Sequence, residues 1–107
     1  MDLPAAVAAY FAASNAENSE EAAGQFTPNA VVKGEGNSHR GREAIRDWHR
    51  ATTQRYHAVA EPFGEERSGD VLAIRAKVTG SFQGSPIDLS FRFVLAGALI
   101  GKLEIGL

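Results

Sequence analysis

The sequence predicts an α+β fold in which helices cover one face of a curved antiparallel sheet. Apolar residues recur at helical spacing from the N-terminus to about Gln54, and from Tyr56 onward the period changes to the alternation of strands. Turn signals at "RSGD", "QGSP" and "LAGA" divide that second half into strands joined by tight turns. Because an antiparallel sheet buries one face, the preceding helices are expected to cover it.

The first helix is predicted from Asp2, which can cap it, with Pro4 in its first turn. One face of this helix is apolar except for a phenol and a hydroxyl, and it carries Leu3, Val7, Tyr10, Phe11 and Ser14. The motif "NSEE" offers a capping box, with Asn18 reaching forward and Glu21 reaching back. It predicts a short second helix that ends near Gly24.

A brief strand and a third helix are expected next. "TPN" reads as a turn, and "AVVKGEGN" as a short strand that runs into a glycine loop. "GEG" is a turn rather than a phosphate cradle, because no third glycine follows at the required spacing. The third helix should run from about Gly41 to Gln54, with Ile45, Trp48, His49 and Thr52 on one face; Arg42, Arg46 and Arg50 form a stripe expected to be solvated.

Four strands are predicted at roughly 56–66, 71–82, 86–95 and 98–107. The second and third alternate most clearly. Their inward faces are expected to hold Leu72, Ile74, Ala76, Val78 and Phe82 from one strand and Ile87, Leu89, Phe91 and Phe93 from the next. Asp88, Ser90 and Arg92 should face outward.

Composition restricts the function classes. The 107 residues suit a single domain over 1–107. The net charge of −2 shows no excess of basic residues of the kind that binds nucleic acid. The absence of cysteine removes disulfides and thiolate nucleophiles. No run approaches the ~20 apolar residues of a membrane span, and the opening segment starts with an acid instead of a basic region, so a cytoplasmic location is expected.

All three histidines lie between His39 and His57. Their spacing matches no common zinc pattern, so no metal site is predicted. His39 is expected in a turn and His57 at the start of a strand. His49 lies on the helix face beside Trp48, where two interpretations stay open: a hydrogen-bonded core histidine, the commoner outcome for a buried imidazole, or a catalytic base.

Three segments carry a family resemblance: "YFAASNAENSEEAAGQFTPNAVVKGEG", "HRGREAIRDWH" and "GSPIDLSFRFVL...GKLEI". Together they resemble the SnoaL-like, polyketide cyclase-like branch of the nuclear-transport-factor-2-like superfamily. The resemblance implies an α+β cone, with three N-terminal helices packed in a strongly bent mixed or antiparallel sheet, a pocket between them, and frequent dimerisation through the sheet. It implies no single activity, because members include cyclases, isomerases, dehydratases, epoxide hydrolases and inactive proteins.

The resemblance to ketosteroid isomerase, a catalytic relative, points to particular residues. The tyrosine that donates to the enolate matches Tyr10, and a further pocket tyrosine matches His49. The two acids of that enzyme fall on Gly34 and Leu89, with Glu35 and Asp88 each one position away. A one-residue slip in a strand turns a side chain to the other face, so neither acid is matched. In the cyclase branch the proton-transferring group falls nearest to Asp88 or His57, which are weaker candidates.

The first hypothesis is a small-molecule-binding protein that acts, as an enzyme or degenerate enzyme without a cofactor, on a small, largely apolar carbonyl compound. The resemblance implies isomerase, cyclase or dehydratase chemistry. His49 would remove a proton next to the carbonyl and Tyr10 would stabilise the oxyanion. The pocket would be lined by Phe26, Trp48, Val78, Phe82, Leu89, Phe91 and Phe93, with Gly80 leaving room for the ligand. The alternative is a non-catalytic ligand-binding or dimerisation module. In either case a homodimer through the outward row of Asp88, Ser90 and Arg92 is expected.

Overall fold

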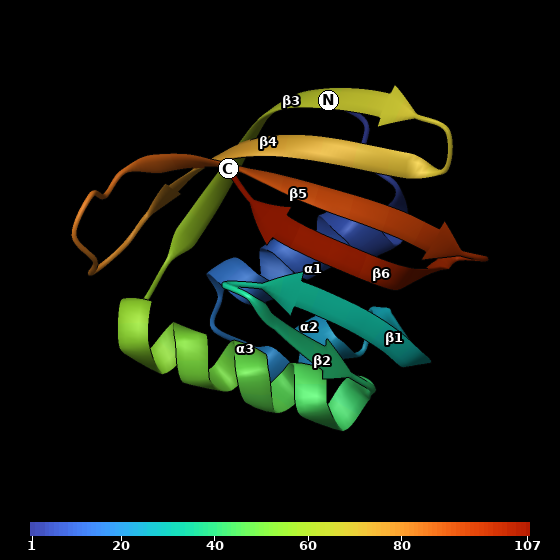
Figure 1. The fold of residues 1–107 in the computed structure, drawn as a ribbon, viewed down its shortest axis with the longest axis horizontal. Helices are drawn as coiled ribbons and strands as arrows, with labels where there is room; N and C mark the ends of the chain where they lie inside the picture. The colour runs from blue at the N-terminus through green and yellow to red at the C-terminus, as the bar shows by residue number, and fades with distance from the viewer.

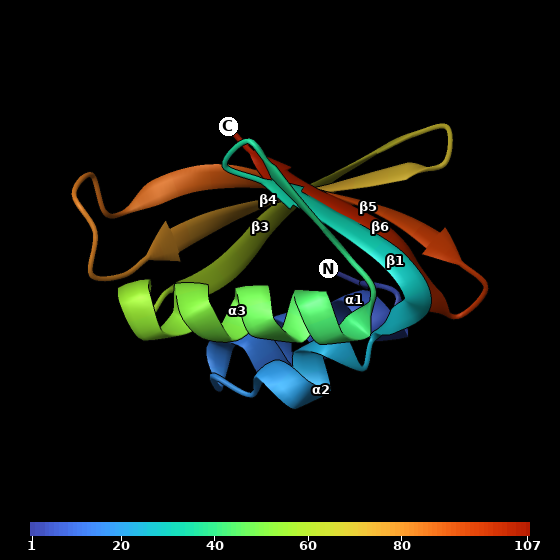
Figure 2. The same cartoon turned by 60° about the horizontal axis from the view of Figure 1, so that its bottom comes forward.

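The computed structural model describes residues 1–107 as a bent six-stranded sheet with three helices on its concave side (Figures 1 and 2). The strand order is β2-β1-β6-β5-β4-β3. The helices are α1 (Ala5–Asn15), α2 (Ser19–Ala23) and α3 (Arg42–Tyr56), and the strands are β1 (Phe26–Gly34), β2 (Asn37–Arg40), β3 (Val59–Ser68), β4 (Val71–Thr79), β5 (Ile87–Ala96) and β6 (Leu99–Gly106). The predicted α+β class and the helix count are correct.

The sheet is mixed, because one of its pairings is parallel. Strands β3 to β6 form antiparallel neighbours, as the alternating pattern and tight turns predict. The last strand, β6, then lies beside β1 in parallel, while β1 and β2 form an antiparallel hairpin. The parallel contact joins the two halves of the chain into one sheet.

Strand β1 is longer than the brief strand predicted from the sequence. The "TPN" segment lies inside it, and a register shift between Phe26 and Val31 against β6 accommodates the irregular stretch. Glu35 and Gly36 form the two-residue turn to β2, both with positive φ (52° and 78°), which suits the twist of a tight hairpin. The prediction that His39 lies in a loop is wrong, since it belongs to β2.

Helix ends differ from the predicted ones by a few residues. Helix α1 starts at Ala5 behind Pro4, and no side chain caps it, so the predicted Asp2 cap does not form. Asn18 caps α2 as predicted, accepting a hydrogen bond from the Glu21 N–H at 3.1 Å. Helix α3 continues to Tyr56 and ends at His57 in the left-handed conformation, so His57 does not begin a strand.

The core lies between α1 and the inner face of the sheet. Tyr10 and Phe11 of α1 meet the sheet aromatics edge to face, with ring centres 5.1–5.9 Å apart, and their partners are Phe26, Phe91 and Phe93. The predicted inward face of β4 is confirmed, because Leu72, Ile74, Ala76 and Val78 are all buried. The aromatic contacts fix α1 against β1 and β5.

Polar side chains attach the helices to their neighbours. The Asn15 amide at the end of α1 exchanges two 2.9 Å hydrogen bonds with the backbone of Ala60 in β3. Arg42 Nε donates to the Phe26 carbonyl oxygen at 2.7 Å. The prediction that the arginine stripe of α3 is solvated is therefore wrong for its first member, because Arg42 binds the start of β1.

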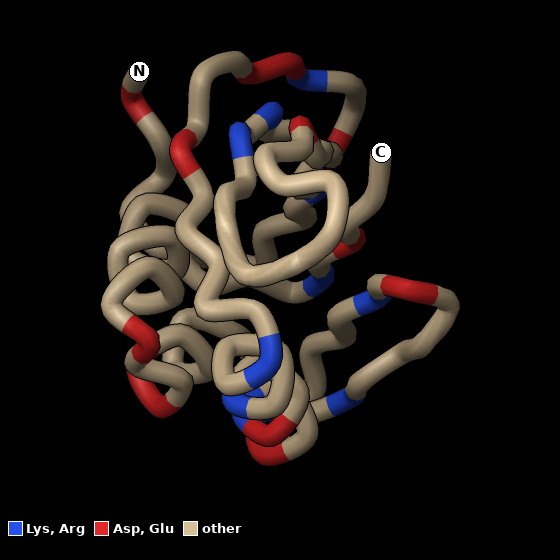
Figure 3. Tube along the Cα trace, turned by 90° about the vertical axis from the view of Figure 1, so that its left-hand side faces the viewer, with Lys and Arg blue, Asp and Glu red and all other residues tan.

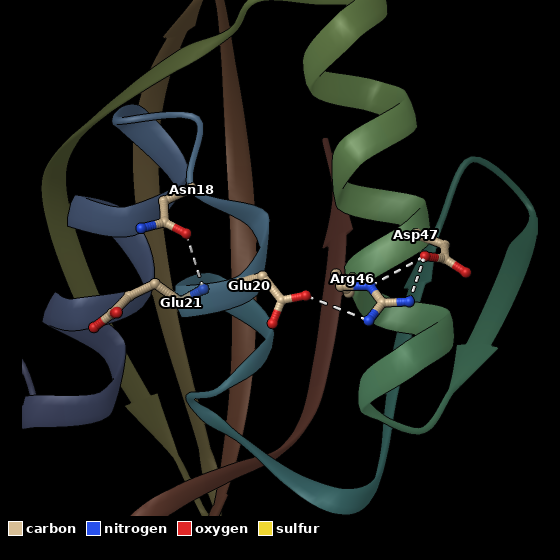
Figure 4. A network of polar contacts seen from close by, with 5 residues as sticks. All are labelled: Asn18, Glu20, Glu21, Arg46 and Asp47. Atoms are coloured by element: carbon tan, nitrogen blue, oxygen red, sulfur yellow. Dashed lines mark hydrogen bonds and ion pairs between the residues drawn. The ribbon is translucent and has the colours of Figure 1, made fainter.

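Arg46, the next member of that stripe, forms ion pairs with Glu20 of α2 at 3.3 Å and with Asp47 at 3.1 Å (Figure 4). The acidic partners are mostly exposed, so each pair adds little to stability by itself. Acidic and basic residues are interspersed along α3 (Figure 3). No helix of this structure has both the length and the apolar character required to cross a membrane.

Gly80 follows the end of β4 and lies against the end of α3. Ser81 N–H donates to the Tyr56 carbonyl oxygen at 2.7 Å, which brings the two backbones together. A Cβ at Gly80 would lie 2.7 Å from that carbonyl oxygen and 3.1 Å from Ala58 Cα. The prediction that Gly80 leaves room for a ligand is wrong: its missing side chain permits backbone contact.

We expect Gly80→Ala to lower the free energy of unfolding by about 1–3 kcal/mol, because the added methyl group must displace backbone atoms. Urea denaturation of the variant measures this loss. Gly34→Ala is the matched control, because its nearest contact would be Ile105 Cβ at an ordinary 3.9 Å. Equal stability of the two variants would show that the approach of β4 to α3 is not tight.

Candidate ligand cavity

A cavity of about 550 Å³ opens between the helices and the sheet. Its helix side carries most of the polar groups, which come from Tyr10, Ser14, His49, Thr52, Thr53 and Tyr56. Its sheet side is apolar and consists of Ala60, Val78, Ile87, Leu89, Phe91 and Ile105. A ligand in this space would therefore meet hydroxyl groups on one side and hydrocarbon on the other.

Five of the seven residues predicted to line a pocket do line this cavity. They are Trp48, Val78, Phe82, Leu89 and Phe91. The other two, Phe26 and Phe93, have no exposed surface and pack against Tyr10 in the core. Alternation along a strand identifies which side chains face inward, but it does not separate those that reach a cavity from those that are fully covered.

Tyr10 lies where the core meets the cavity. Its side chain is 3% exposed, and burial raises the pKa of the phenol well above its ordinary value, while a hydrogen bond to Ser14 acts weakly in the opposite direction. The phenol therefore keeps its proton at neutral pH. It is placed to donate a hydrogen bond to an oxygen atom of a ligand.

His49 is buried, and hydroxyl groups contact both of its ring nitrogens. Nδ1 lies 2.7 Å from Ser19 Oγ of α2, and Nε2 lies 2.8 Å from Ser14 Oγ of α1. Burial lowers the pKa of the imidazole, with a smaller opposing effect from Glu17. The ring is thus neutral at pH 7, with one nitrogen donating and the other accepting, and it connects all three helices.

The structure brings Tyr10 and His49 together, with ring centres 6.3 Å apart and at an interplanar angle of 75°. Ser14 contacts both, since its hydroxyl hydrogen-bonds the phenol and lies beside Nε2. Ser14 also lines the cavity. The three side chains therefore form one polar cluster at the edge of the cavity.

The weaker catalytic candidates lie elsewhere. His57 is exposed, with Nδ1 2.9 Å from Glu17 Oε2, and Asp88 is exposed opposite Lys77 in the sheet. Neither lines the cavity. His39 stacks on Trp48 with ring centres 5.8 Å apart, and the structure gathers no three His, Asp or Glu side chains that could hold a metal ion.

Glu35 is the cavity residue that the sequence argument set aside. It lines the cavity and is the only carboxylate side chain there. In a strand, the neighbour of an inward position points outward, and Glu35 was excluded for that reason. Glu35 is instead the first residue of a tight turn with φ of 52°, where strand alternation does not apply. The "GEG" motif, which indicates a turn, was the available signal.

Comparisons with known proteins agree with this geometry. The family model described as the SnoaL-like domain matches residues 7–98. The chain belongs to the SnoaL-like family. Among curated proteins no sequence matches it significantly. A Sinorhizobium meliloti protein, provisionally described as a polyketide cyclase, shares 40% identity over 99% of this chain and 97% of its own, with a TM-score of 0.93.

Two further solved structures show the same fold at lower identity. A cystatin-fold protein from Novosphingobium aromaticivorans is 22% identical over 100% of this chain and 99% of its own, with a TM-score of 0.80. A hypothetical protein with a ketosteroid isomerase-like fold from Catenulispora acidiphila is also 22% identical, over 99% of this chain and 87% of its own, with a TM-score of 0.83. At this identity the likeness concerns the fold alone.

We expect the stability of this SnoaL-like protein to depend on the protonation of His49. Because folding lowers the pKa of this imidazole, the unfolded chain binds more protons below its ordinary value of about 6.5. The stabilisation is complete above that value and falls as the pH decreases toward the folded-state pKa. The slope should approach about 1.4 kcal/mol per pH unit at most.

Urea unfolding between about pH 7.5 and pH 5.5 measures this slope. His49→Gln should be less stable at neutral pH and should lose this part of the pH dependence. His57→Gln is the control for loss of a histidine, because that side chain is exposed and lies outside the helix contacts of His49. A His49→Gln slope equal to that of the original protein would contradict the prediction.

Proposed function

We propose that this SnoaL-like protein binds a small, largely apolar carbonyl compound in the cavity, with the carbonyl oxygen at the Tyr10 phenol. The observation that carries the proposal is the buried, protonated Tyr10 hydroxyl beside an apolar cavity. In such surroundings an unpaired ligand oxygen is costly, so the phenol fixes the orientation of the ligand.

The size and the lining of the cavity support this class of ligand. Its volume of about 550 Å³ lies within the usual range for small-molecule sites. Hydroxyl groups of Ser14, Thr52 and Thr53 add polar contacts on the helix side, and the sheet side is apolar. A flat molecule with one oxygen-bearing edge and one hydrocarbon edge matches this division.

The catalytic form of the proposal is isomerase, cyclase or dehydratase chemistry without a cofactor. A proton next to the carbonyl would leave the ligand carbon for Ser14 Oγ as the serine proton passes to His49 Nε2, which lies 2.8 Å away. Tyr10 would donate to the enolate oxygen that forms. General-base and oxyanion contributions of this kind are each about 10²-fold or more in rate.

A specific observation favours the second candidate, a non-catalytic ligand-binding module. Both His49 nitrogens already have hydroxyl partners, so the imidazole is fully hydrogen-bonded within the protein. A base that contacts its substrate directly would need one nitrogen free. Measurements of binding and of proton transfer distinguish the two forms.

Tyr10→Phe should weaken binding of α-tetralone, a neutral bicyclic ketone, by about three- to tenfold, because one hydrogen bond to the carbonyl is lost. Tetralin, the same skeleton without oxygen, should bind both proteins equally. Quenching of Trp48 fluorescence reports binding, since the single tryptophan lines the cavity. Tyr56→Phe is the matched control, because it removes a phenol from another part of the same cavity.

Absence of tetralone binding, or an equal loss in both variants, would contradict the assignment of Tyr10. Proton transfer is tested by following exchange of the α-protons of tetralone in deuterated water by NMR. Faster exchange that disappears in Ser14→Ala and His49→Gln identifies the catalytic form. Exchange at the solvent rate, together with binding, identifies the ligand-binding module.

We also propose a homodimer formed through the outer face of the sheet. The predicted outward row is charged, and its members lie opposite complementary residues: Lys77 faces Asp88, and Arg92 faces Glu104. Ser90 was predicted to face outward with this row, but it is buried and accepts a hydrogen bond from Arg75 at 2.7 Å. Alternating charges of this kind allow two copies to pair opposite signs across a two-fold axis.

Sedimentation at micromolar concentration should give the mass of a dimer, and Arg92→Glu should shift it toward the monomer by placing like charges together. Arg50→Glu is the control, because Arg50 is exposed on α3 away from the sheet face. A monomer for the original protein at this concentration would remove the dimer.

A further inference from the structure

The cavity has an uneven distribution of charge. Glu35 is the only side chain with a formal charge among the residues that line it, since they include no Lys or Arg, and burial lowers the pKa of His49 so that it stays neutral. Glu35 is exposed, and none of the ion pairs of the structure includes it. Its carboxylate is therefore open to a charged group on a ligand.

The basic residues nearest to this region have other acidic neighbours. A shallow polar groove adjoins the cavity at Glu35 and also contains Lys33, Arg92 and Glu104. Glu104 lies opposite Lys33 in the β1–β6 pairing and opposite Arg92 in the β5–β6 pairing. Glu104 offsets only part of the basic charge of the groove, but neither Lys33 nor Arg92 forms an ion pair with Glu35.

Two helix ends add negative potential to the same space. Ser14 lies in the last turn of α1, and Thr53 and Tyr56 lie in the last turn of α3, and all three line the cavity. The C-terminal end of a helix carries partial negative charge and favours cations. Arg55 offsets this effect in part at α3, where its guanidinium carbon lies 5.1 Å from the centre of the Tyr56 ring.

Aromatic rings complete the environment. Trp48 and Phe82 line the cavity and are only partly buried, so their rings are accessible to a ligand. The faces of such rings attract ammonium groups, with tryptophan the most effective. A carboxylate ligand would meet the opposite conditions: no basic side chain in the cavity lining, a carboxylate that repels it, and an apolar wall that removes its water.

We propose that the cavity selects ligands by charge, accepting apolar molecules that carry a tertiary or quaternary ammonium group and excluding carboxylates, with Glu35 as the residue that sets this preference. The inference deepens the proposed function and rests on it, because it concerns the ligand of the same cavity. It adds a second point of recognition, so that the ligand oxygen contacts Tyr10 and the ammonium group lies toward Glu35.

Three phenols of similar shape test the inference. They are (para-hydroxyphenyl)trimethylammonium, its uncharged counterpart para-tert-butylphenol, and para-hydroxybenzoate, each titrated against the full-length protein by calorimetry at low salt. The ammonium compound should bind about tenfold more tightly than the tert-butyl compound, which is about 1.4 kcal/mol. The carboxylate should bind at least tenfold more weakly than the tert-butyl compound.

Glu35→Gln keeps the size of the side chain and the strained backbone position but removes the charge. In this variant the ammonium preference should fall to about twofold, while binding of para-tert-butylphenol stays unchanged. Glu61→Gln is the matched control, since Glu61 is an exposed carboxylate on β3 that does not line the cavity. Circular dichroism of both variants confirms that they fold.

The outcomes separate this inference from the proposed function. Equal affinity for the ammonium and tert-butyl compounds overturns the charge preference and leaves the ligand cavity in place. Equal affinity for para-hydroxybenzoate and para-tert-butylphenol also overturns the charge preference and leaves the ligand cavity in place. A preference that persists in Glu35→Gln overturns the role of Glu35. Failure of all three phenols and of α-tetralone to bind overturns the ligand-binding function and the inference together.

Discussion

The arrangement of the helices depends on one buried imidazole whose two nitrogens both have partners. His49 of α3 reaches Ser14 on α1 through Nε2 and Ser19 on α2 through Nδ1. A buried polar ring without such partners would cost about 1–3 kcal/mol for each unmade hydrogen bond, so the three helices are held at one relative position. The positions of Tyr10 and of the helix side of the cavity follow from this contact.

Helix α3 borders the cavity and is attached to the sheet near both of its ends. At the start of α3, Arg42 binds the Phe26 carbonyl oxygen, and at its end the Tyr56 carbonyl oxygen accepts the Ser81 N–H next to Gly80. Between these points Trp48, Thr52 and Thr53 line the cavity, and the Trp48 ring also stacks on His39 of β2. Gly80 was expected to leave room for a ligand; its missing side chain instead permits the backbone contact that attaches this end of α3.

The sequence predicted the features that depend on periodicity. The helical face of Tyr10 and Phe11 and the inward faces of β4 and β5 were correct because apolar alternation reports directly on burial. Features that depend on tertiary contacts were missed. The parallel pairing of β1 with β6 and the binding of Arg42 to a backbone carbonyl join segments far apart in the chain, and no local pattern encodes them.

Predicted positions of site residues were wrong where the inward–outward alternation of a strand was applied to residues outside a strand. His57 was placed on a strand but caps a helix, and Glu35 was set aside by parity but lies in a turn. By contrast, Tyr10 and His49 lie on helices whose periods are clear, and the structure brings them together. Helical spacing relates residues over several turns, whereas strand parity is lost at each turn or bulge.

A structural role that connects the helices and a role as catalytic base place opposite requirements on His49. To connect the helices, His49 must keep both hydroxyl partners, and burial favours its neutral form. To act as a base, it must accept a proton, and the buried site disfavours the charged form that results. Contacts to a ligand are therefore expected first from groups that the fold does not use for its own structural contacts. These are the protonated phenol of Tyr10 and the unpaired carboxylate of Glu35, a donor and an anion in one apolar space, and the ligand that satisfies both must carry an oxygen and a positive charge.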